Sequence, residues 1–330
     1  MLVNPNNVEV LKKALSDAAP TGSFLPAVYV LELTGVCDLA CIMCPHDRMR
    51  PSRKSHIPLN RFKYILDLIA PTAELVMFYF MGESTLHPDF SDAMKMAREK
   101  LKGRIVISSN MAHVSGRDLE AMAEFADLVI CPIDRWSQRS YEAIRRGANF
   151  NAVVSNVKRL CELSVDRGVK VVPKLLGLTL GSTKGGSLDE GEVRSFEDYW
   201  LSLGATPLAG WVSTWAGQIP SLGRHLSIPV PVISQPRQAC ADLWFKMVIL
   251  HSGDVVLCCN DYDGSHIVGS VLSSGVAEVW HSARIISLRE NHAEGHFACT
   301  ALCRGCREWA TLSELDCYLR LEYNDLFVVF

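Results

Sequence analysis

Runs of β-branched and other apolar residues alternate with helical patterns from residue 27 to about residue 215. Such alternation is typical of successive strand–helix units that build one parallel sheet with helices packed against it. The stretch from Phe150 to Arg167 is a clear example of the helical pattern, because its valines and leucines fall on one face. The sequence therefore predicts an α/β fold of the partial (β/α)6, TIM-like barrel type, with strands at residues 27–34, 74–80, 104–109, 127–133, 169–178 and 208–213.

The chain has 330 residues, which is long for one core, since domains of about 100–150 residues are commonest. A proline-punctuated extended stretch between Ile228 and Pro236 marks the predicted boundary. Beyond it, LWFKMVIL and DVVLCC flank HSGD, which predicts a β-hairpin with a glycine turn. We expect an N-terminal helical extension (1–26), a barrel core (27–230) and a C-terminal domain (231–330).

Composition narrows the classes of partner. The 33 basic and 36 acidic residues give a formal net charge of -3 without a long basic run, which argues against nucleic acid as a partner. The N-terminus has no apolar signal core, and no run of about 18 apolar residues occurs. We expect a cytoplasmic protein that does not bind membranes and acts on a small molecule.

Twelve cysteines would suit a disulfide scaffold only in a small secreted chain, so metal ligation is the better explanation for most of them. Cys37, Cys41 and Cys44 form a C-x3-C-x2-C pattern in the loop after the first predicted strand. Three thiolates supply three ligands of a 4Fe-4S cluster and leave one iron open. The alternative is structural zinc, which takes four protein ligands, and only His46 stands at an ordinary spacing for the fourth.

The segment VCDLACIMCPHDRMR resembles the cluster-binding loop of the radical S-adenosylmethionine (SAM) superfamily. The resemblance implies that the open iron binds SAM and that one electron cleaves it to a 5'-deoxyadenosyl radical. It also implies an electron donor such as flavodoxin or ferredoxin.

Two further segments resemble the SAM-contact elements of this superfamily. Met81-Gly82-Glu83 follows the second strand and is similar to a Gly-Gly-Glu segment that receives the SAM ammonium. Ser109 and Asn110 end the third strand and resemble a Thr-Asn-Gly element near the SAM carboxylate and ribose. The resemblance implies that Gly82, Glu83, Ser109 and Asn110 bind SAM.

The later elements match less completely. Asp134 follows the fourth strand and resembles the acidic residue of a Ser-x-Asp-Gly element, although Pro132 and Arg135 replace its serine and glycine. Arg145 and Arg146 match a segment whose arginine commonly reaches the SAM carboxylate. A bidentate guanidinium suits that role, so Asp134 and Arg145 complete the implied SAM-binding set.

A second set of cysteines follows the layout C-x17-C-x44-C-x2-C, formed by Cys240, Cys258, Cys303 and Cys306. Four thiolates fully ligate a 4Fe-4S cluster, and they also suit a tetrahedral zinc site. The layout and the GDVVLCCND run resemble the SPASM/twitch subfamily, known from aminocyclitol and aminoglycoside enzymes such as 2-deoxy-scyllo-inosamine dehydrogenase. The resemblance implies an auxiliary 4Fe-4S cluster.

The remaining cysteines leave alternatives open. Cys299 can replace Cys303 as a ligand, and Cys317 is a further candidate. Cys259 follows Cys258 on a predicted strand, so its side chain is expected on the opposite face. It is either a hydrogen donor that quenches a substrate radical, as implied by resemblance to aminoglycoside epimerases, or a small buried apolar residue. Cys131 is expected in the core, as is Cys161 on the helix after it.

Lys174 interrupts the apolar run VVPKLLG in the fifth strand. An unpaired buried ammonium is costly, so Lys174 either faces the barrel lumen, as a catalytic candidate, or extends to solvent at the strand end. The loop at 181–192 follows the same strand, where barrel enzymes place substrate contacts. Further candidate substrate groups lie in and after this loop: Asp189, Glu190, Glu192, Trp211 and Trp215.

The predicted function is that of a radical SAM oxidoreductase acting on a sugar or aminocyclitol of secondary metabolism, such as antibiotic biosynthesis, by alcohol oxidation. Epimerisation with Cys259 as hydrogen donor and decarboxylation of a sugar acid are the alternatives. A different class, the peptide-modifying SPASM maturases, usually carries an N-terminal recognition domain, whereas 26 residues precede the first predicted strand here. We therefore expect a small substrate.

Overall fold

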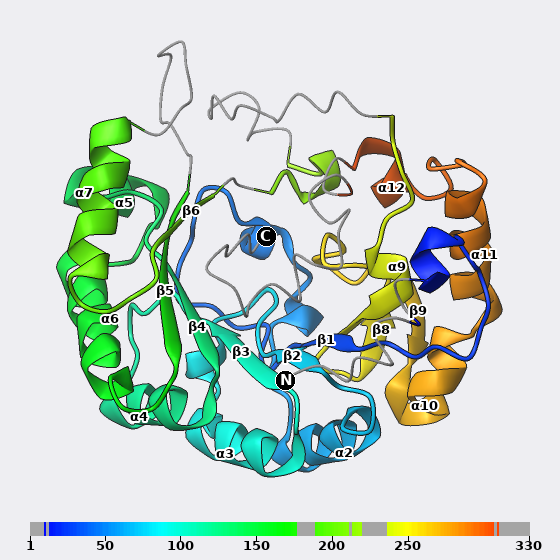
Figure 1. Cartoon of the computed structure of the whole chain (residues 1–330), viewed down its shortest axis with the longest axis horizontal. Helices are drawn as coiled ribbons and strands as arrows, with labels where there is room; N and C mark the ends of the chain where they lie inside the picture. The colour runs from blue at the N-terminus through cyan, green and yellow to red at the C-terminus, as the bar shows by residue number, and fades with distance from the viewer. Residues whose placement is uncertain are drawn as a thin grey trace.

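The computed structural model describes residues 10, 13–176, 189–210, 213–219, 236–306 and 309. Nine strands form one curved sheet in the order β6-β5-β4-β3-β2-β1-β7-β8-β9. Figure 1 shows this sheet as an arc with helices along its outer side and the loop after β1, drawn in blue, on its inner side. Because β6 and β9 end the strand order, the sheet is open over the part of the chain that the structure describes.

The six predicted strands are confirmed, and each pairs in parallel with the next along the chain. The partial-barrel prediction is therefore correct, with the carboxyl ends of these strands at one edge of the sheet. The strands are β1 (Val28–Leu31), β2 (Leu75–Met77), β3 (Arg104–Ser108), β4 (Leu128–Pro132), β5 (Lys170–Leu176) and β6 (Leu208–Gly210).

Helices connect these strands and bury one apolar face each. In α6 the Asn149 side chain accepts a hydrogen bond from the Ala152 amide and caps the helix, and Val153, Val157 and Leu160 are fully buried. The outer helices are α2 (Leu59–Ile69), α3 (Phe90–Lys100), α4 (Gly116–Phe125), α5 (Gln138–Ile144), α6 (Phe150–Ser164) and α7 (Glu190–Leu201). Short 3-10 turns are η1 (Pro45–Arg48), η2 (Pro51–Arg53), η3 (Ser84–Leu86) and η4 (Trp215–Gly217).

The C-terminal part continues the same sheet instead of forming a separate one. Strand β7 (Lys246–Ile249) pairs in parallel with β1, and β8 (Asp254–Val256) and β9 (Ile267–Ser270) follow as antiparallel neighbours. The predicted hairpin is confirmed, and its turn contains Gly253 with φ +90°, a conformation that suits glycine. The remaining helices are α9 (Asp242–Phe245), α10 (Val271–Trp280), α11 (Ala283–Ala293) and α12 (Ala301–Gly305).

Two local predictions are wrong. The first half of LWFKMVIL is the short helix α9, because Asp242 in its first turn pairs with Lys246 four residues later and turns the chain into β7. In the predicted loop at 181–192, Glu190 and Glu192 belong to α7, which Asp189 caps by accepting from the Glu192 amide. Residues 181–188 of that loop lie outside the described residues, as do 229–235 of the predicted boundary.

The N-terminal extension packs against the C-terminal part. Residues 13–16 are helical, while most of the preceding predicted helix lies outside the described residues. The Trp244 indole donates to the Ala19 carbonyl at 2.8 Å, and the buried Arg289 guanidinium lies over the Phe24 ring. Figure 1 shows this dark-blue segment beside α11. Among the described helices, none is long and apolar enough to cross a membrane.

A buried ion pair joins the exit of β1 to the cysteine loop and the hairpin. Arg53 donates to both oxygens of Glu32, at 2.7 and 2.8 Å, and the Glu32 side chain is fully buried. The His251 amide donates to the same carboxylate at 3.2 Å, and the His251 Nε2 donates to the Arg53 carbonyl at 3.1 Å. Three segments distant in sequence therefore meet at one bidentate pair.

We expect Arg53→Met to lower the free energy of unfolding by about 3–5 kcal/mol, because it leaves the Glu32 carboxylate buried without its cation. Urea unfolding of the cofactor-free chain measures this loss. Arg117→Met is the control, since Arg117 and Asp92 form an exposed ion pair that contributes about 1 kcal/mol or less. Adding Glu32→Leu to Arg53→Met should recover much of the lost free energy of unfolding, because no buried charge is then left without a partner. Equal losses in the Arg53→Met and Arg117→Met variants would contradict a stabilising role of the buried Glu32–Arg53 pair.

Candidate active site

The cysteine loop leaves β1 and lies directly on the segment after β2. The Glu83 amide donates to the Val36 carbonyl at 2.8 Å. A Cβ atom added at Gly82 would come within 2.2 Å of the Thr34 carbonyl oxygen and 2.7 Å of the Val36 oxygen. Only glycine fits this close backbone contact. The predicted cluster loop and the first predicted SAM segment are therefore neighbours.

Glu83 links this segment to the end of β3. Its carboxylate accepts from the Asn110 amide at 2.7 Å, and burial raises the pKa of the Glu83 carboxyl. The Asn110 side chain donates at 2.8 Å to Asp38, inside the cysteine loop. Ser109 directly precedes Asn110, and its hydroxyl accepts a hydrogen bond from the Met111 amide. The structure thus brings together Gly82, Glu83, Ser109 and Asn110 beside the loop, and adds Asp38, which the sequence analysis missed.

Arg145 and Asp134 form a second buried pair on the other side of the loop. The Arg145 guanidinium donates to both Asp134 oxygens, at 2.6 and 3.2 Å, and Asp134 is fully buried. The Ala40 amide donates to the Arg146 carbonyl, and the Ile42 amide donates to the Ile144 carbonyl. Arg145 is therefore held beside the cysteine loop, with Asp134 as its partner; contact with a SAM carboxylate stays a prediction.

Lys174 lies near this pair. Its side chain is 4% exposed, so the ammonium does not extend to solvent. The pKa of Lys174 is lowered to about 8, mainly by burial; the negative charge of Asp134 opposes this shift, and the positive charge of Arg145 adds to it. Lys174 can therefore lose its proton at a pH close to neutrality, which suits a general base.

The three loop thiols fit a metal cluster. Burial raises the pKa values of Cys37 and Cys44 to about 12, and the neighbouring Cys41 contributes to both shifts. Thiolates in such a place need a positive partner, and the irons of a cluster supply it. The His46 Nε2 donates to the Gly35 carbonyl at 2.9 Å instead of completing a zinc site.

Trp215 helps to hold the same loop. Its indole donates to the Met43 carbonyl at 3.0 Å, between two of the cysteines, and its ring contacts Tyr262 edge-on. The sequence suggested Trp215 as a substrate contact. The structure shows that Trp215 binds the cysteine loop, and its contact with a substrate stays a prediction. Trp211 lies outside the described residues. Glu192 accepts from the Trp136 amide and pairs with Arg135.

The four predicted auxiliary ligands surround one hollow of about 480 Å³, counted with its open mouth. Burial raises the pKa values of Cys240 and Cys258 well above the usual thiol value and also raises that of Cys303. Thiols with such pKa values on the lining of one hollow suit a metal cluster that stabilises their ionised forms. The lining cysteines are Cys240, Cys258, Cys303 and Cys306.

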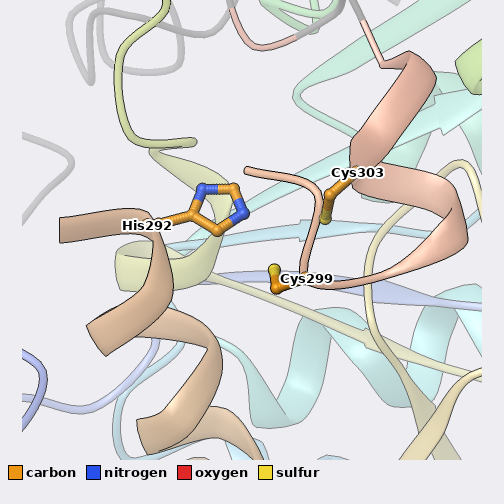
Figure 2. A group of neighbouring side chains, drawn as sticks. All are labelled: His292, Cys299 and Cys303. Atoms are coloured by element: carbon orange, nitrogen blue, oxygen red, sulfur yellow. The ribbon is translucent and has the colours of Figure 1, made fainter. Parts of the chain in front are cut away.

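One histidine joins this group, and it was not predicted. His292 of α11 lies with Cys299 and Cys303 so that a ring nitrogen and the two sulfurs are all within 4.8 Å of one another. Figure 2 shows the imidazole turned toward both sulfurs. Cys299 is exposed, whereas Cys303 is half-buried. Cys317 lies outside the described residues. A lone histidine in a helix gives no sequence signal for such a position.

Cys259 lies in a different polar cluster from Lys174. Its sulfur accepts from Lys246 at 3.7 Å and lies 3.9 Å from Asp242, the two members of a buried ion pair. Its role as a hydrogen donor remains a prediction. Cys131 and Cys161 are buried in the main core, as expected.

Comparison with known families defines the class of protein. Residues 31–182 match the family model of the radical SAM superfamily, and residues 240–307 match that of the SPASM iron-sulfur cluster-binding domain. The chain therefore belongs to the radical SAM superfamily and carries a SPASM-type domain. Membership implies 4Fe-4S clusters and SAM as cofactors, in agreement with the thiol groups described above.

Individual relatives are more distant. The chain is 24% identical over 85 residues to the S-adenosyl-L-methionine-dependent 2-deoxy-scyllo-inosamine dehydrogenase of Niallia circulans. That match covers 26% of this chain and only about a third (34%) of the relative.

Two solved structures share the fold over most of both chains. BtrN in complex with AdoMet and 2-DOIA has a TM-score of 0.57 and 15% identity, covering 86% of this chain and 93% of BtrN. SuiB of Streptococcus suis bound to the precursor peptide SuiA has a TM-score of 0.63 and 14% identity, covering 94% and 77%.

We expect anaerobic reconstitution to load about eight irons per chain, as two 4Fe-4S clusters. Replacing Cys37, Cys41 and Cys44 together with alanine should halve that iron, and so should replacing the four cysteines of the hollow, because each set holds one cluster. Iron and sulfide analysis measures the content. The control is Cys161→Ala, a core cysteine that should not change the iron content. Zinc in place of iron would refute the assignment.

Proposed function

We propose that this enzyme oxidises an alcohol of a sugar or aminocyclitol to a ketone. The observation that carries the proposal is Lys174, a buried amine whose pKa is lowered to about 8, beside Asp134 and Arg145 at the cysteine loop. The partial likeness to 2-deoxy-scyllo-inosamine dehydrogenase and the fold shared with BtrN support the substrate class.

The cofactors and the protein side chains would carry out different parts of this reaction. When bound, SAM and its cluster would supply a 5'-deoxyadenosyl radical that removes a hydrogen atom from carbon, and the auxiliary cluster would accept the remaining electron. Neutral Lys174 takes the hydroxyl proton, so that hydrogen atom, proton and electron account for the two-electron oxidation. Asp134 stabilises the ammonium that forms on Lys174, whereas the positive charge of Arg145 disfavours it and so helps to keep Lys174 neutral before the proton transfer.

Peptide modification is the competing class. SuiB was solved with its precursor peptide, and anSMEcpe, which has a TM-score of 0.55 and 14% identity to this chain, was solved with the Cp18Cys peptide. The shared fold therefore does not separate small-molecule from peptide substrates. The lowered pKa of Lys174 favours alcohol oxidation, because that reaction must remove a hydroxyl proton.

We expect the reconstituted enzyme, with SAM and a reductant, to form one 5'-deoxyadenosine for each ketone produced from 2-deoxy-scyllo-inosamine or a related aminocyclitol. Liquid chromatography with mass spectrometry measures both products. Carbon dioxide release from a sugar acid would indicate decarboxylation, and modification of a peptide would indicate the maturase class.

Cys259→Ala distinguishes oxidation from epimerisation in the same assay. Oxidation needs no hydrogen donor from the chain, so this variant should keep forming ketone. Continued 5'-deoxyadenosine formation with loss of an epimerised product would contradict the dehydrogenase proposal.

Lys174 gives the reaction a defined pH dependence. Since its neutral form accepts the proton, kcat/KM should rise about tenfold per pH unit below pH 8 and level off above it. Lys174→Met should lower ketone formation by about 100-fold or more and abolish this dependence. Lys170→Met, at the start of the same strand, is the control and should keep the wild-type profile. An unchanged profile in Lys174→Met would refute the role of Lys174.

A further inference from the structure

His292 is buried at the edge of the predicted auxiliary site. Its side chain is 2% exposed, and its ring contacts the Phe297 ring edge-on. The Cys240 amide donates a hydrogen bond of 3.2 Å to the His292 Nδ1. The imidazole is therefore fixed by the backbone of one predicted ligand while it lies close to the sulfur of another, Cys303.

The hydrogen bond at Nδ1 decides which nitrogen carries the proton. A nitrogen that accepts a hydrogen bond has no proton of its own, so the proton of the imidazole is on Nε2. A protonated Nε2 has no lone pair for a metal and is a hydrogen-bond donor. This tautomer argues against His292 as an iron or zinc ligand.

The Nε2 atom is fully buried and has no hydrogen-bond partner within the part of the chain that the structure describes. A buried N–H without an acceptor is costly, so such groups in native proteins usually have a partner. Figure 2 shows the ring edge remote from α11 directed at the sulfurs of Cys299 and Cys303. Sulfur atoms of a cluster in the hollow are acceptors of the right kind.

A second buried side-chain N–H group, that of Asn260, lines the same hollow and also faces a sulfur. The Asn260 side-chain amide donates to the Cys306 sulfur at 4.0 Å, and Asn260 is 5% exposed. Arg237 donates to the Cys303 carbonyl at 2.7 Å and lies over the Phe297 ring. The walls of this site thus present buried N–H groups and one cation to the predicted cluster ligands.

We propose that His292 is a positioning residue that donates its Nε2–H to sulfur of the auxiliary cluster and so raises its reduction potential. Hydrogen bonds to cluster sulfurs stabilise the more negative, reduced state and are among the main determinants of cluster potential. His292 would thereby help the cluster to accept the electron left by substrate oxidation. This inference rests on the auxiliary cluster of the proposed function.

Two substitutions separate the functions of the two ring nitrogens. His292→Asn keeps an acceptor near the Nδ1 position and removes the distal donor, whereas His292→Gln extends an amide N–H toward the Nε2 position. In full-length protein with Cys37, Cys41 and Cys44 replaced by alanine, only the auxiliary cluster is observed. A redox titration followed by electron paramagnetic resonance (EPR) measures its potential.

We expect His292→Asn to lower the ratio of reduced to oxidised cluster about tenfold at a given potential, a shift of about 59 mV for one electron, and His292→Gln to stay near the wild-type value. His296→Asn, an exposed control on the following turn, should also leave it unchanged. Equal potentials in all these proteins, with iron content retained, would overturn the role of His292. Loss of iron in both His292 variants would indicate that it is a ligand and would also overturn it.

A measurement on protein with His292 intact tests the inference even if the His292 variants do not fold. Pulsed EPR of the reduced auxiliary cluster in protein labelled with 15N-histidine should show a weak coupling, as expected for a hydrogen-bonded nitrogen. A strong coupling would mean direct ligation, and no coupling would mean no contact; either result refutes the inference. Absence of any cluster signal or iron would instead refute the auxiliary cluster itself, so the two failures can be told apart.

Discussion

The bidentate pair of Glu32 and Arg53 is the contact on which the arrangement of this enzyme depends. Glu32 is at the exit of β1, Arg53 ends the cysteine loop, and His251 in the β7–β8 turn binds both of them. Because the pair is buried, neither charge can be solvated if the other moves away. The loop that carries the predicted ligands of the first cluster and the hairpin that precedes Cys258 are thus fixed to the same point of the sheet.

Buried polar side chains gather around the cysteine loop, at the ends of otherwise apolar strands. Glu83 and Asn110 hold one side of the loop, and Asp134 and Arg145 hold the other. The ion pair of Asp134 with Arg145 and the hydrogen bonds that Glu83 accepts offset the cost of burying these charges. Burial lowers the pKa of Lys174 to about 8, so this amine can exchange a proton near the cysteine loop at a pH where an exposed lysine stays charged.

The sequence predicts those features that depend on local periodicity or spacing. All six barrel strands and the β7–β8 hairpin were found from apolar patterns, and cysteine spacing selected four thiols that share one hollow. The pairing of β7 with β1 was not predictable, because it joins Val28 to Lys246 and depends on which sheet edge is free. The α9 turn was missed because a short apolar run fits a strand or a buried helix equally well. Asp38 was missed because its partner Asn110 lies far away in sequence, and His292 because a lone histidine in a helix gives no signal for its place beside Cys299 and Cys303.

The same β1–β7 pairing determines when the fold can be completed. Strand β1 has β2 as its neighbour early in synthesis, but its other edge remains unpaired until a strand more than 200 residues later has been made. Contacts of such long sequence separation form slowly, and an exposed strand edge in an incomplete chain is prone to aggregate. A chain cut near residue 230 would retain the whole predicted barrel core and still expose this edge. The C-terminal domain therefore acts as a folding partner for the barrel as well as the holder of a second cluster.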